Sequence, residues 1–193
     1  MIPKYWNEIL QGLSYWIAYK KQYFKDHLLT EGAIVAELTQ LLSAKIESNM
    51  RIECERMYKE INPQIIDQSR VDILIGKKTN DKYKNGKIKK LMPNELLEII
   101  EVKRYEGDWK KVEVDFEKLF KLKKNLPNTR LFQIVVGQEK LPDKIFNSKH
   151  NLMRRSIYNG NVELKTLPRL SKKAFSTKKE SEKGVYSILI EII

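Results

Sequence analysis

The residues of this chain that could carry out chemistry are two carboxylates and a lysine on apolar segments. Asp72 lies inside the run RVDILI at residues 70–75, and Glu101 and Lys103 follow the run LLEII at residues 96–100. Residues two apart on a strand share a face, so Glu101 and Lys103 are expected to point the same way. Burying bare carboxylates is costly, and neighbouring carboxylates raise each other's pKa. The pattern predicts a divalent cation that neutralises both acids, with Lys103 positioning water and offsetting charge on a phosphate.

Hydrophobic periodicity predicts the elements that must position these residues. Helical spacing covers residues 3–28 and 31–47, with Thr30 as the N-cap of the second segment. A third helix is expected to begin at its cap Asp108 and to stop at Leu126-Pro127. Short β-branched or aromatic runs predict strands at residues 51–60, 71–76, 96–102, 131–137 and 185–193. A helix between the third and fourth strands permits a parallel crossover. We therefore expect an α/β fold with a small mixed β-sheet flanked by helices and an extra N-terminal helix.

Two local predictions accompany this order. On the strand at residues 51–60, Ile52, Cys54 and Tyr58 are expected to share one face. The aromatic stripe of the N-terminal helix is interpreted as core or a dimer contact. Within residues 138–184, the basic stretch SKKAFSTKKESEKG at residues 171–184 is expected to be mobile. We expect one domain over residues 1–193, with the N-terminal helix in 1–29, the catalytic core in 30–137 and an extension in 138–193.

Asp72 followed by Glu101-Val102-Lys103, in this order of elements, resembles the PD-(D/E)xK nuclease superfamily over residues 30–137. The resemblance implies a restriction-endonuclease-like core, α-β-β-β-α-β, and Mg²⁺-dependent hydrolysis of a phosphodiester bond, with Mn²⁺ as a substitute. It maps the two acidic ligands and the lysine onto Asp72, Glu101 and Lys103, and Val102 joins the predicted metal-binding residues. Val71 stands where the motif has proline, which weakens the match only slightly.

A further acid, common in the family on the helix before the first strand, has two candidates. At about 100° per residue, Glu31 projects toward the apolar arc of that helix, whereas Glu37 points roughly 120° away from its centre. A ligand must face the sheet, which favours Glu31 and leaves Glu37 in reserve. The alternative for Glu31 is a favourable charge at a helix N-terminus.

The same letters occur once more, so the context of the motif matters. Pro142-Asp143 is followed by Glu163-Leu164-Lys165, but neither piece has the flanking strand and helix pattern. For the favoured site, the alternative is that Glu101 and Lys103 form an exposed pair while Asp72 pairs with Arg70 or Arg104.

Secondary candidates are weaker. Gln133 could line the site but is interpreted as a satisfied polar residue. Asp115 and Lys118 could support Lys103 or a phosphate but are interpreted as a solvated face. His27 and His150 have no metal-ligand spacing.

Composition favours a polyanionic partner, because the 193 residues carry a formal net charge of +12. The lysines predicted to contact phosphate are Lys77, Lys78, Lys87, Lys89, Lys90 and Lys118. The alternative is a soluble, mobile loop. The lone Cys54 excludes an internal disulfide and a cysteine cluster for zinc. No stretch approaches the roughly 20 apolar residues of a membrane span, and no signal peptide is evident. We expect a cytoplasmic protein without a membrane partner.

These observations together predict a Mg²⁺-dependent endonuclease acting on double-stranded DNA, as a homodimer if both strands are cut. A restriction or anti-phage defence role follows from family analogy alone. The alternatives are an RNA nuclease, a junction-resolving nuclease for branched DNA, and a nucleic-acid-binding module that no longer cuts.

Overall fold

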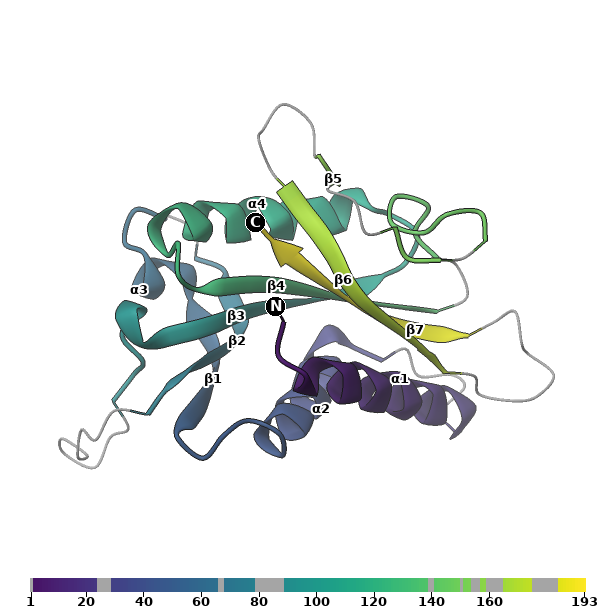
Figure 1. The fold of residues 1–193 in the computed structure, drawn as a ribbon, viewed down its shortest axis with the longest axis horizontal. Helices are drawn as coiled ribbons and strands as arrows, with labels where there is room; N and C mark the ends of the chain where they lie inside the picture. Colours follow the sequence, from purple (N-terminus) through teal and green to yellow (C-terminus); the bar gives the residue numbers. More distant parts are fainter. Residues whose placement is uncertain are drawn as a thin grey trace.

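A seven-stranded mixed β-sheet with helices on both faces forms the protein, as a computed structural model shows (Figure 1). The structure describes residues 2–23, 29–65, 68–78, 89–138, 141–149, 151–153, 157–158, 165–174 and 184–193. Its elements are α1 Tyr5–Tyr23, α2 Glu31–Ser43, β1 Met50–Met57, α3 Tyr58–Ile61, β2 Arg70–Lys77, the 3₁₀ turn Pro93–Glu95, β3 Leu96–Tyr105, α4 Lys110–Asn125, β4 Arg130–Gln138, β5 Ile157–Tyr158, β6 Lys165–Ala174 and β7 Val185–Ile192. The expected α/β class with a mixed sheet is confirmed.

The strands lie in the order β1-β2-β3-β4-β7-β6-β5. The one parallel pair described is β3–β4, which α4 connects, while β1–β2, β2–β3, β4–β7 and β6–β7 are antiparallel. A parallel pair needs a crossover connection, and α4 supplies it. The expected order helix, strand, strand, strand, helix, strand is therefore found from α2 to β4, with the short α3 inserted after β1.

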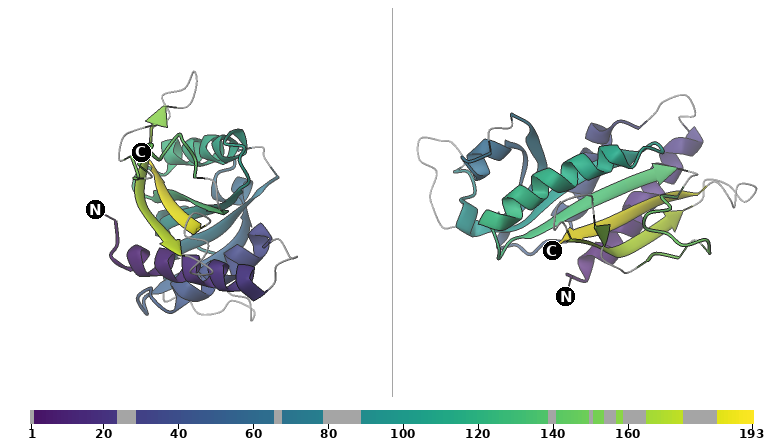
Figure 2. Two further views of the ribbon diagram at one scale, coloured as in Figure 1. Left: turned by 90° about the vertical axis from the view of Figure 1, so that its right-hand side faces the viewer. Right: turned by 90° about the horizontal axis from the view of Figure 1, so that it is seen from above.

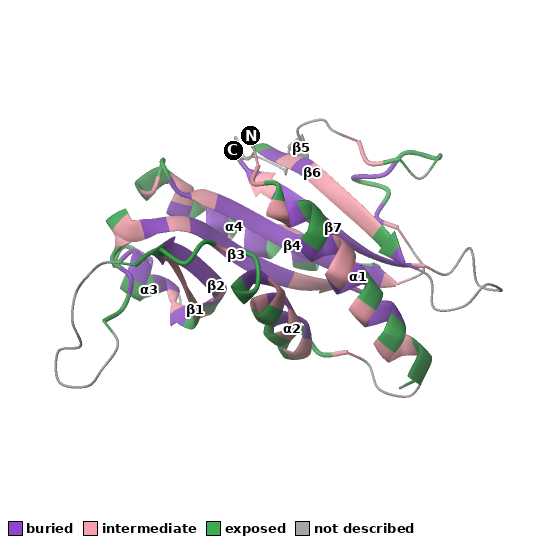
Figure 3. Ribbon diagram, turned by 60° about the horizontal axis from the view of Figure 1, so that its bottom comes forward, coloured by how far each residue is buried: buried purple, intermediate pink, exposed green. Residues whose placement is uncertain are grey.

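The sheet separates two apolar layers (Figure 2). On one face, α4 covers residues such as Ile99 and Val135 with Phe116 and Leu119. On the other face, α1 and α2 cover residues such as Ile100 and Ile134. Alternate residues of β3 and β4 face opposite layers, as the two-residue period of a strand requires. Figure 3 shows the result, with buried central strands such as β3 and β4 and exposed outer faces of the helices.

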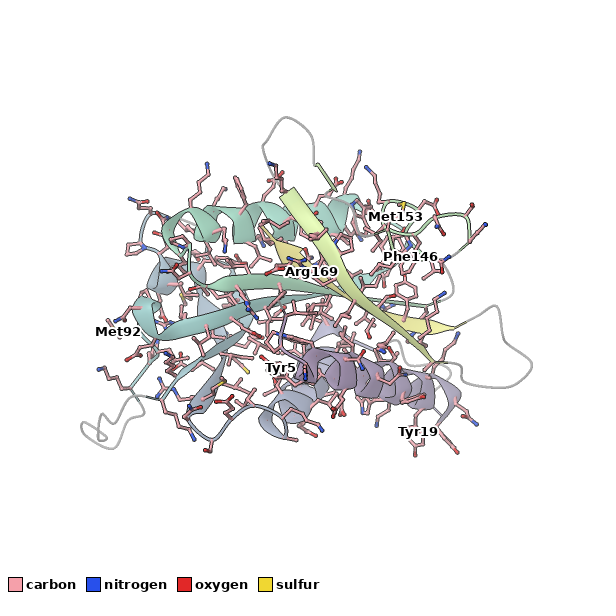
Figure 4. All side chains as sticks on the ribbon, in the orientation of Figure 1. Tyr5, Tyr19, Met92, Phe146, Met153 and Arg169 are labelled. Carbon is pink, nitrogen blue, oxygen red and sulfur yellow. The ribbon has the colours of Figure 1, made fainter. Side chains whose placement is uncertain are left out.

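Helix α1 belongs to the core, as the interpretation of its aromatic stripe allowed. Trp6 is fully buried and meets Phe132 of β4 edge-on, with ring centroids 5.6 Å apart. Ser14 and Ser187 share a hydrogen bond of 2.7 Å between their hydroxyl oxygens, which ties α1 to β7. Tyr19 lies on the outer side of the helix and is exposed (Figure 4). The predicted residues 24–28 of this helix lie outside the described residues.

The two predicted helix caps have different outcomes. The Thr30 hydroxyl accepts a hydrogen bond from the Ala33 amide at 3.2 Å, so its prediction as N-cap is confirmed. The prediction of Asp108 as the cap of α4 is wrong by one residue, because Trp109 occupies the N-cap position, although the Asp108 carboxylate accepts from the Lys110 amide at 3.0 Å. Among the described residues, no helix is long and apolar enough to cross a bilayer.

Three local predictions are wrong. Tyr58 does not share a strand face with Ile52 and Cys54, because β1 ends at Met57 and Tyr58 opens α3. Strand β3 does not stop at its charged residues but continues to Tyr105, because β4 pairs with it as far as Tyr105 and Gly137. Part of the segment expected to be mobile, up to Ala174, lies in β6.

The β6 error has a physical cause. Local composition disfavours a strand there because of its lysines and Pro168, but β6 pairs with β7 over its length, with a register shift between Pro168 and Leu170. Proline is tolerated in a sheet where its missing N–H needs no partner or where a bulge interrupts the ladder. Arg169 also pairs with Glu191 of β7 (Figure 4). Residues 175–183 lie outside the described part of the chain.

Candidate active site

Asp72 and Glu101 lie side by side on the face of the sheet that α4 covers. The β2–β3 ladder ends at the pair Ile73 and Ile100, so Asp72 and Glu101 are the next residues on the two strands. Beyond this pair, the Val102 amide donates to the Asp72 carboxylate at 2.7 Å instead of to a neighbouring backbone. The Asp72 carboxylate thus accepts from the backbone of β3 just beyond the end of the β2–β3 ladder. The sequence prediction that these two acids converge agrees with this geometry.

The pKa values of both carboxyl groups are raised. Burial, followed by the nearby charge of Asp72, raises the pKa of Glu101 well above its usual value. Burial also raises the pKa of Asp72, although the Val102 amide and a hydrogen bond from Glu101 pull in the other direction. Glu101 is only 6% exposed. Because burial and nearby negative charges raise both pKa values, a positive charge close to the pair would favour the ionised carboxylates.

Tyr58 is a site residue that sequence reasoning missed. Its hydroxyl donates to Oε1 of Glu101, and burial raises the pKa of Tyr58, so this donor keeps its proton. Tyr58 is fully buried at the start of α3. Its position depends on where the chain leaves β1, and an alternating pattern through residues 51–60 gives no signal of that turn.

Lys103 lies between two further acids. Its Nζ is 3.3 Å from Oδ2 of Asp115 on α4 and 3.4 Å from Oε1 of Glu31 on α2. Burial alone would lower the pKa of Lys103, but the charges of Asp115 and Glu31 outweigh it and raise the pKa. Lys103 is therefore an ammonium group at neutral pH. It can hold and polarise groups as a cation, and it does not act as a proton acceptor in this state.

Asp115 corrects another prediction. It does not belong to a solvated face, because it is 6% exposed and faces Lys103. Lys118 lies 3.4 Å from the same carboxylate and is partly buried. The turn of α4 that buries Phe116 against the sheet also turns Asp115 toward β3. A helical period predicts which residues share a face but not how far that face extends around the helix.

Glu31 joins the cluster from the first turn of α2. Its carboxylate accepts a hydrogen bond from the Arg104 amide at 3.2 Å, in addition to the ion pair with Lys103. Its charge contributes to the raised pKa of Asp72. Of the two candidate acids on this helix, Glu31 contacts Lys103. Its role as a metal ligand stays a prediction. Glu37 is partly buried on α2.

The structure differs from the alternative in which these charges form ordinary surface pairs. Arg70 pairs with Glu55 at 3.9 Å, and Arg104 pairs with Glu106 at 2.5 Å. Asp72 instead accepts from a backbone amide. The second occurrence of the motif has no comparable setting, since Asp143 is exposed in a turn and Glu163 and Leu164 lie outside the described residues.

Glu55 of β1 is an acid opposite Asp72 alone, and sequence reasoning did not select it. It stands between the register pairs Cys54–Ile73 and Arg56–Val71, which places it opposite Asp72. Its charge contributes to the raised pKa of Asp72. Its φ of 57° is the left-handed conformation, which costs a side-chain-bearing residue about 1–2 kcal/mol. Such strain often accompanies functional sites, and only the conformation of β1 reveals it.

The residues present fit a small divalent cation. Mg²⁺ commonly binds through one or two carboxylates and keeps several waters, which suits Asp72 and Glu101. The Val102 carbonyl points to the same side as its amide, because both backbone groups of a strand residue face one neighbour. Among the described residues, no three acidic, histidine or cysteine side chains form a metal-binding group. The site therefore offers two carboxylates with a main-chain oxygen, and not a full protein cage.

Gln133 lies next to this pair, and its interpretation as a satisfied polar residue is wrong. It is the register partner of Glu101 on β4 and is fully buried. Neither its amide nitrogen nor its amide oxygen has a hydrogen-bond partner within the described part of the chain.

The predicted phosphate-binding lysines lie in different parts of the structure. Lys77 is the last residue of β2, about 17 Å along the strand from Asp72 at roughly 3.3 Å per residue, and Lys78 follows it. The Lys78 Nζ donates to the Ser48 carbonyl at 2.7 Å, and Lys90 pairs with Glu60 at 2.7 Å. Lys89 is exposed, and Lys87 lies outside the described residues. Contacts from Lys77 and Lys78 would reach phosphates distant from the one at Asp72.

Two pockets are lined by residues that neighbour the site residues in the sequence. One of about 370 Å³ is lined by Arg104, Glu106, Gly107 and the end of β4. Another of about 600 Å³ runs along β1 and includes Glu55, Arg56, Arg70 and Lys90. In the described residues, neither lining includes Asp72, Glu101 or Lys103. The three therefore lie outside both hollows.

Comparison of the chain with family models, with curated proteins and with solved structures gives no match. The case for a function therefore depends on the residues of the site and their geometry.

Proposed function

We propose that this chain is a Mg²⁺-dependent endonuclease that hydrolyses phosphodiester bonds of DNA on a restriction-endonuclease-like core. One observation carries the proposal: two adjacent carboxyl groups with raised pKa values, Asp72 and Glu101, share a sheet face with the charged Lys103. The order of elements from α2 to β4, which the resemblance implies, supports it. The net charge of +12 supports a nucleic acid as the partner.

Each residue has a distinct role in this proposal. Asp72 and Glu101 hold the cation, with the Val102 carbonyl beside them, and Tyr58 fixes the orientation of Glu101. When bound, Mg²⁺ supplies Lewis-acid stabilisation of charge on the phosphate. Lys103 positions the attacking water and offsets charge that develops on the phosphate oxygens. Asp115 and Glu31 hold the Lys103 ammonium in place.

The test is a digest by the purified full chain with Mg²⁺. Supercoiled and linear duplex DNA, single-stranded DNA, branched DNA and RNA are compared as substrates, each with and without EDTA. We expect cleavage of duplex DNA that EDTA abolishes. Preference for RNA or for branched DNA would instead support the alternative nuclease classes. Because one such site cuts one strand, we expect a dimer on duplex DNA.

Two variants and a matched control assign the site. We expect Lys103→Ala to lower the cleavage rate at least about 100-fold while DNA binding is retained. Asp72→Asn is expected to abolish the heat of Mn²⁺ or Ca²⁺ binding in calorimetry. Lys121→Ala removes an exposed lysine from α4 and is expected to leave cleavage unchanged. Normal cleavage by Lys103→Ala would show that the site is assigned wrongly.

A second function is a nucleic-acid-binding module that does not cut. The observation that favours it is the lack, among the described residues, of a third side-chain ligand next to Asp72 and Glu101. DNA binding with no cleavage of any substrate at any Mg²⁺ or Mn²⁺ concentration would support this function and contradict the first. A cytoplasmic location and a role in defence remain part of the proposal.

A further inference from the structure

The side-chain amide of Gln133 is buried at an energetic cost. Its side chain is fully buried, and both polar groups of its amide lack hydrogen-bond partners among the described residues. Leaving a buried donor or acceptor unsatisfied costs about 1–3 kcal/mol per group. A leucine or methionine of similar size would fill the same space without that cost. Each such group in a native structure therefore calls for a reason.

The surroundings of Gln133 restrict where a partner can come from. Its register partner on β7 is Ile190, which is fully buried and apolar. Along its own strand, the residues on the same face are Leu131 and Val135, which are also buried. Its register partner on β3 is Glu101. Of these four neighbours, Glu101 alone offers polar atoms.

Two polar side chains contact the Glu101 carboxyl group among the described residues. Tyr58 donates to its Oε1, and the Glu101 carboxyl also hydrogen-bonds with Asp72. A carboxylate that shares a cation with Asp72 has two oxygens to satisfy, and each accepts more than one hydrogen bond. Carboxylates that ligate metals are usually held by such outer hydrogen bonds. Gln133 lies on the neighbouring strand at the position from which its amide can provide one.

From this arrangement we infer that Gln133 is a positioning residue of the cation site, whose amide nitrogen donates to the Glu101 carboxylate when a divalent cation is bound. The inference rests on the cation site of the proposed function. It explains why a costly amide occupies a buried place where an apolar residue would suffice. Tyr58 and Gln133 then orient Glu101 from α3 and from β4, on either side of β3.

The experiment compares Gln133→Met with the wild-type full chain in two measurements. Calorimetric titration with Mn²⁺ is expected to show binding at least about tenfold weaker in the variant. Thermal unfolding in EDTA is expected to show the same midpoint or a higher one, because two unsatisfied polar groups have been removed. A variant that only lost packing would be less stable. Weaker Mn²⁺ binding at unchanged or higher stability therefore indicates a role at the cation site.

A matched control lies on the other side of Gln133. Ile190→Met changes the same layer by a swap of similar volume but does not face Glu101. It is expected to change the unfolding midpoint slightly and to leave Mn²⁺ affinity unchanged. Gln133→Leu is a second test variant, with the same expectation as Gln133→Met.

The outcomes separate this inference from the proposed function. If wild-type protein shows no Mn²⁺ binding that Asp72→Asn removes, the cation site itself is refuted. If the wild type binds Mn²⁺ and both Gln133 variants bind it equally well, only the role of Gln133 is refuted. Lower stability of both variants in EDTA, or failure of both to fold, would also refute it, because the amide would then stabilise the cation-free protein.

Discussion

Replacing Glu98 with glutamine should remove a penalty that the wild-type protein carries at neutral and alkaline pH. Glu98 lies on β3, on the face opposite Glu101, and is 4% exposed. The Trp6 indole donates to its Oε2 at 3.2 Å, and Tyr5 is a second hydrogen-bond partner. Glutamine has the same shape and can keep polar contacts with both residues, but it never ionises.

The magnitude follows from the pKa of Glu98, which burial raises from 4.5 to about 7 against the opposing effects of Tyr5 and Arg130. The folded state favours the protonated acid, so the contribution of Glu98 to stability is complete below about pH 4.5 and is lost as the pH rises to about 7. At about 1.36 kcal/mol per pKa unit, the full change is about 3 kcal/mol. The variant does not undergo this loss.

Urea unfolding in EDTA at several pH values from about 4.5 to about 8 measures the effect. The quantity to follow is the free energy of unfolding of Glu98→Gln minus that of the wild type, because other titrating groups cancel in the difference. We expect this difference to rise by about 3 kcal/mol across the range. Tyr5→Phe should move the transition to higher pH, because Tyr5 lowers the pKa of Glu98. A difference that stays constant with pH would refute the reasoning that burial holds Glu98 protonated.

Three further outcomes are expected at the site. Tyr58→Phe should lower the free energy of unfolding in EDTA by about 1–3 kcal/mol, because buried Glu101 loses its donor, and an unchanged urea midpoint would contradict this. Asp115→Asn should lower the cleavage rate about tenfold or more by releasing Lys103 while DNA affinity measured by anisotropy changes little, and it fails as a prediction if the rate is unaltered. Glu55→Gly should raise the free energy of unfolding by about 1 kcal/mol by relieving its positive φ, whereas Glu55→Gln should not, and equal stabilities of the two variants would count against strain at this position.

Much of the fold is visible in local patterns. The β-branched run at residues 131–136 and the apolar runs around Asp72 and Glu101 predict strands β4, β2 and β3, because side chains buried on both faces leave continuous apolar runs. Thr30 marks the start of α2 through a hydrogen bond within one helical turn. Strand β6 was missed because its pairing with β7 stabilises a sequence that local propensity disfavours.

Some features of the candidate site are also predictable from the sequence, and others are not. The spacing of Glu101 and Lys103 on one strand already requires a common face, and the apolar setting of Asp72 already indicates that its charge needs a partner. The partners of these three residues could not be predicted. Tyr58 reaches Glu101 because the chain turns into α3 at that residue, and Asp115 reaches Lys103 because of the rotation of α4 on the sheet.

The sequence by itself therefore determined the order of the helices and strands from α1 to β4 apart from the short α3, the last strand β7, and the side-chain types able to do chemistry, because periodicity and side-chain type are local properties. Only the tertiary structure decided that the β2–β3 ladder ends before Asp72, that Gln133 is buried beside Glu101 with no hydrogen-bond partner in the described part of the chain, and that Lys77 and Lys78 lie far from the acids. Strand register, helix rotation and the end of a ladder arise from contacts between residues distant in the chain. No window of neighbouring residues contains that information.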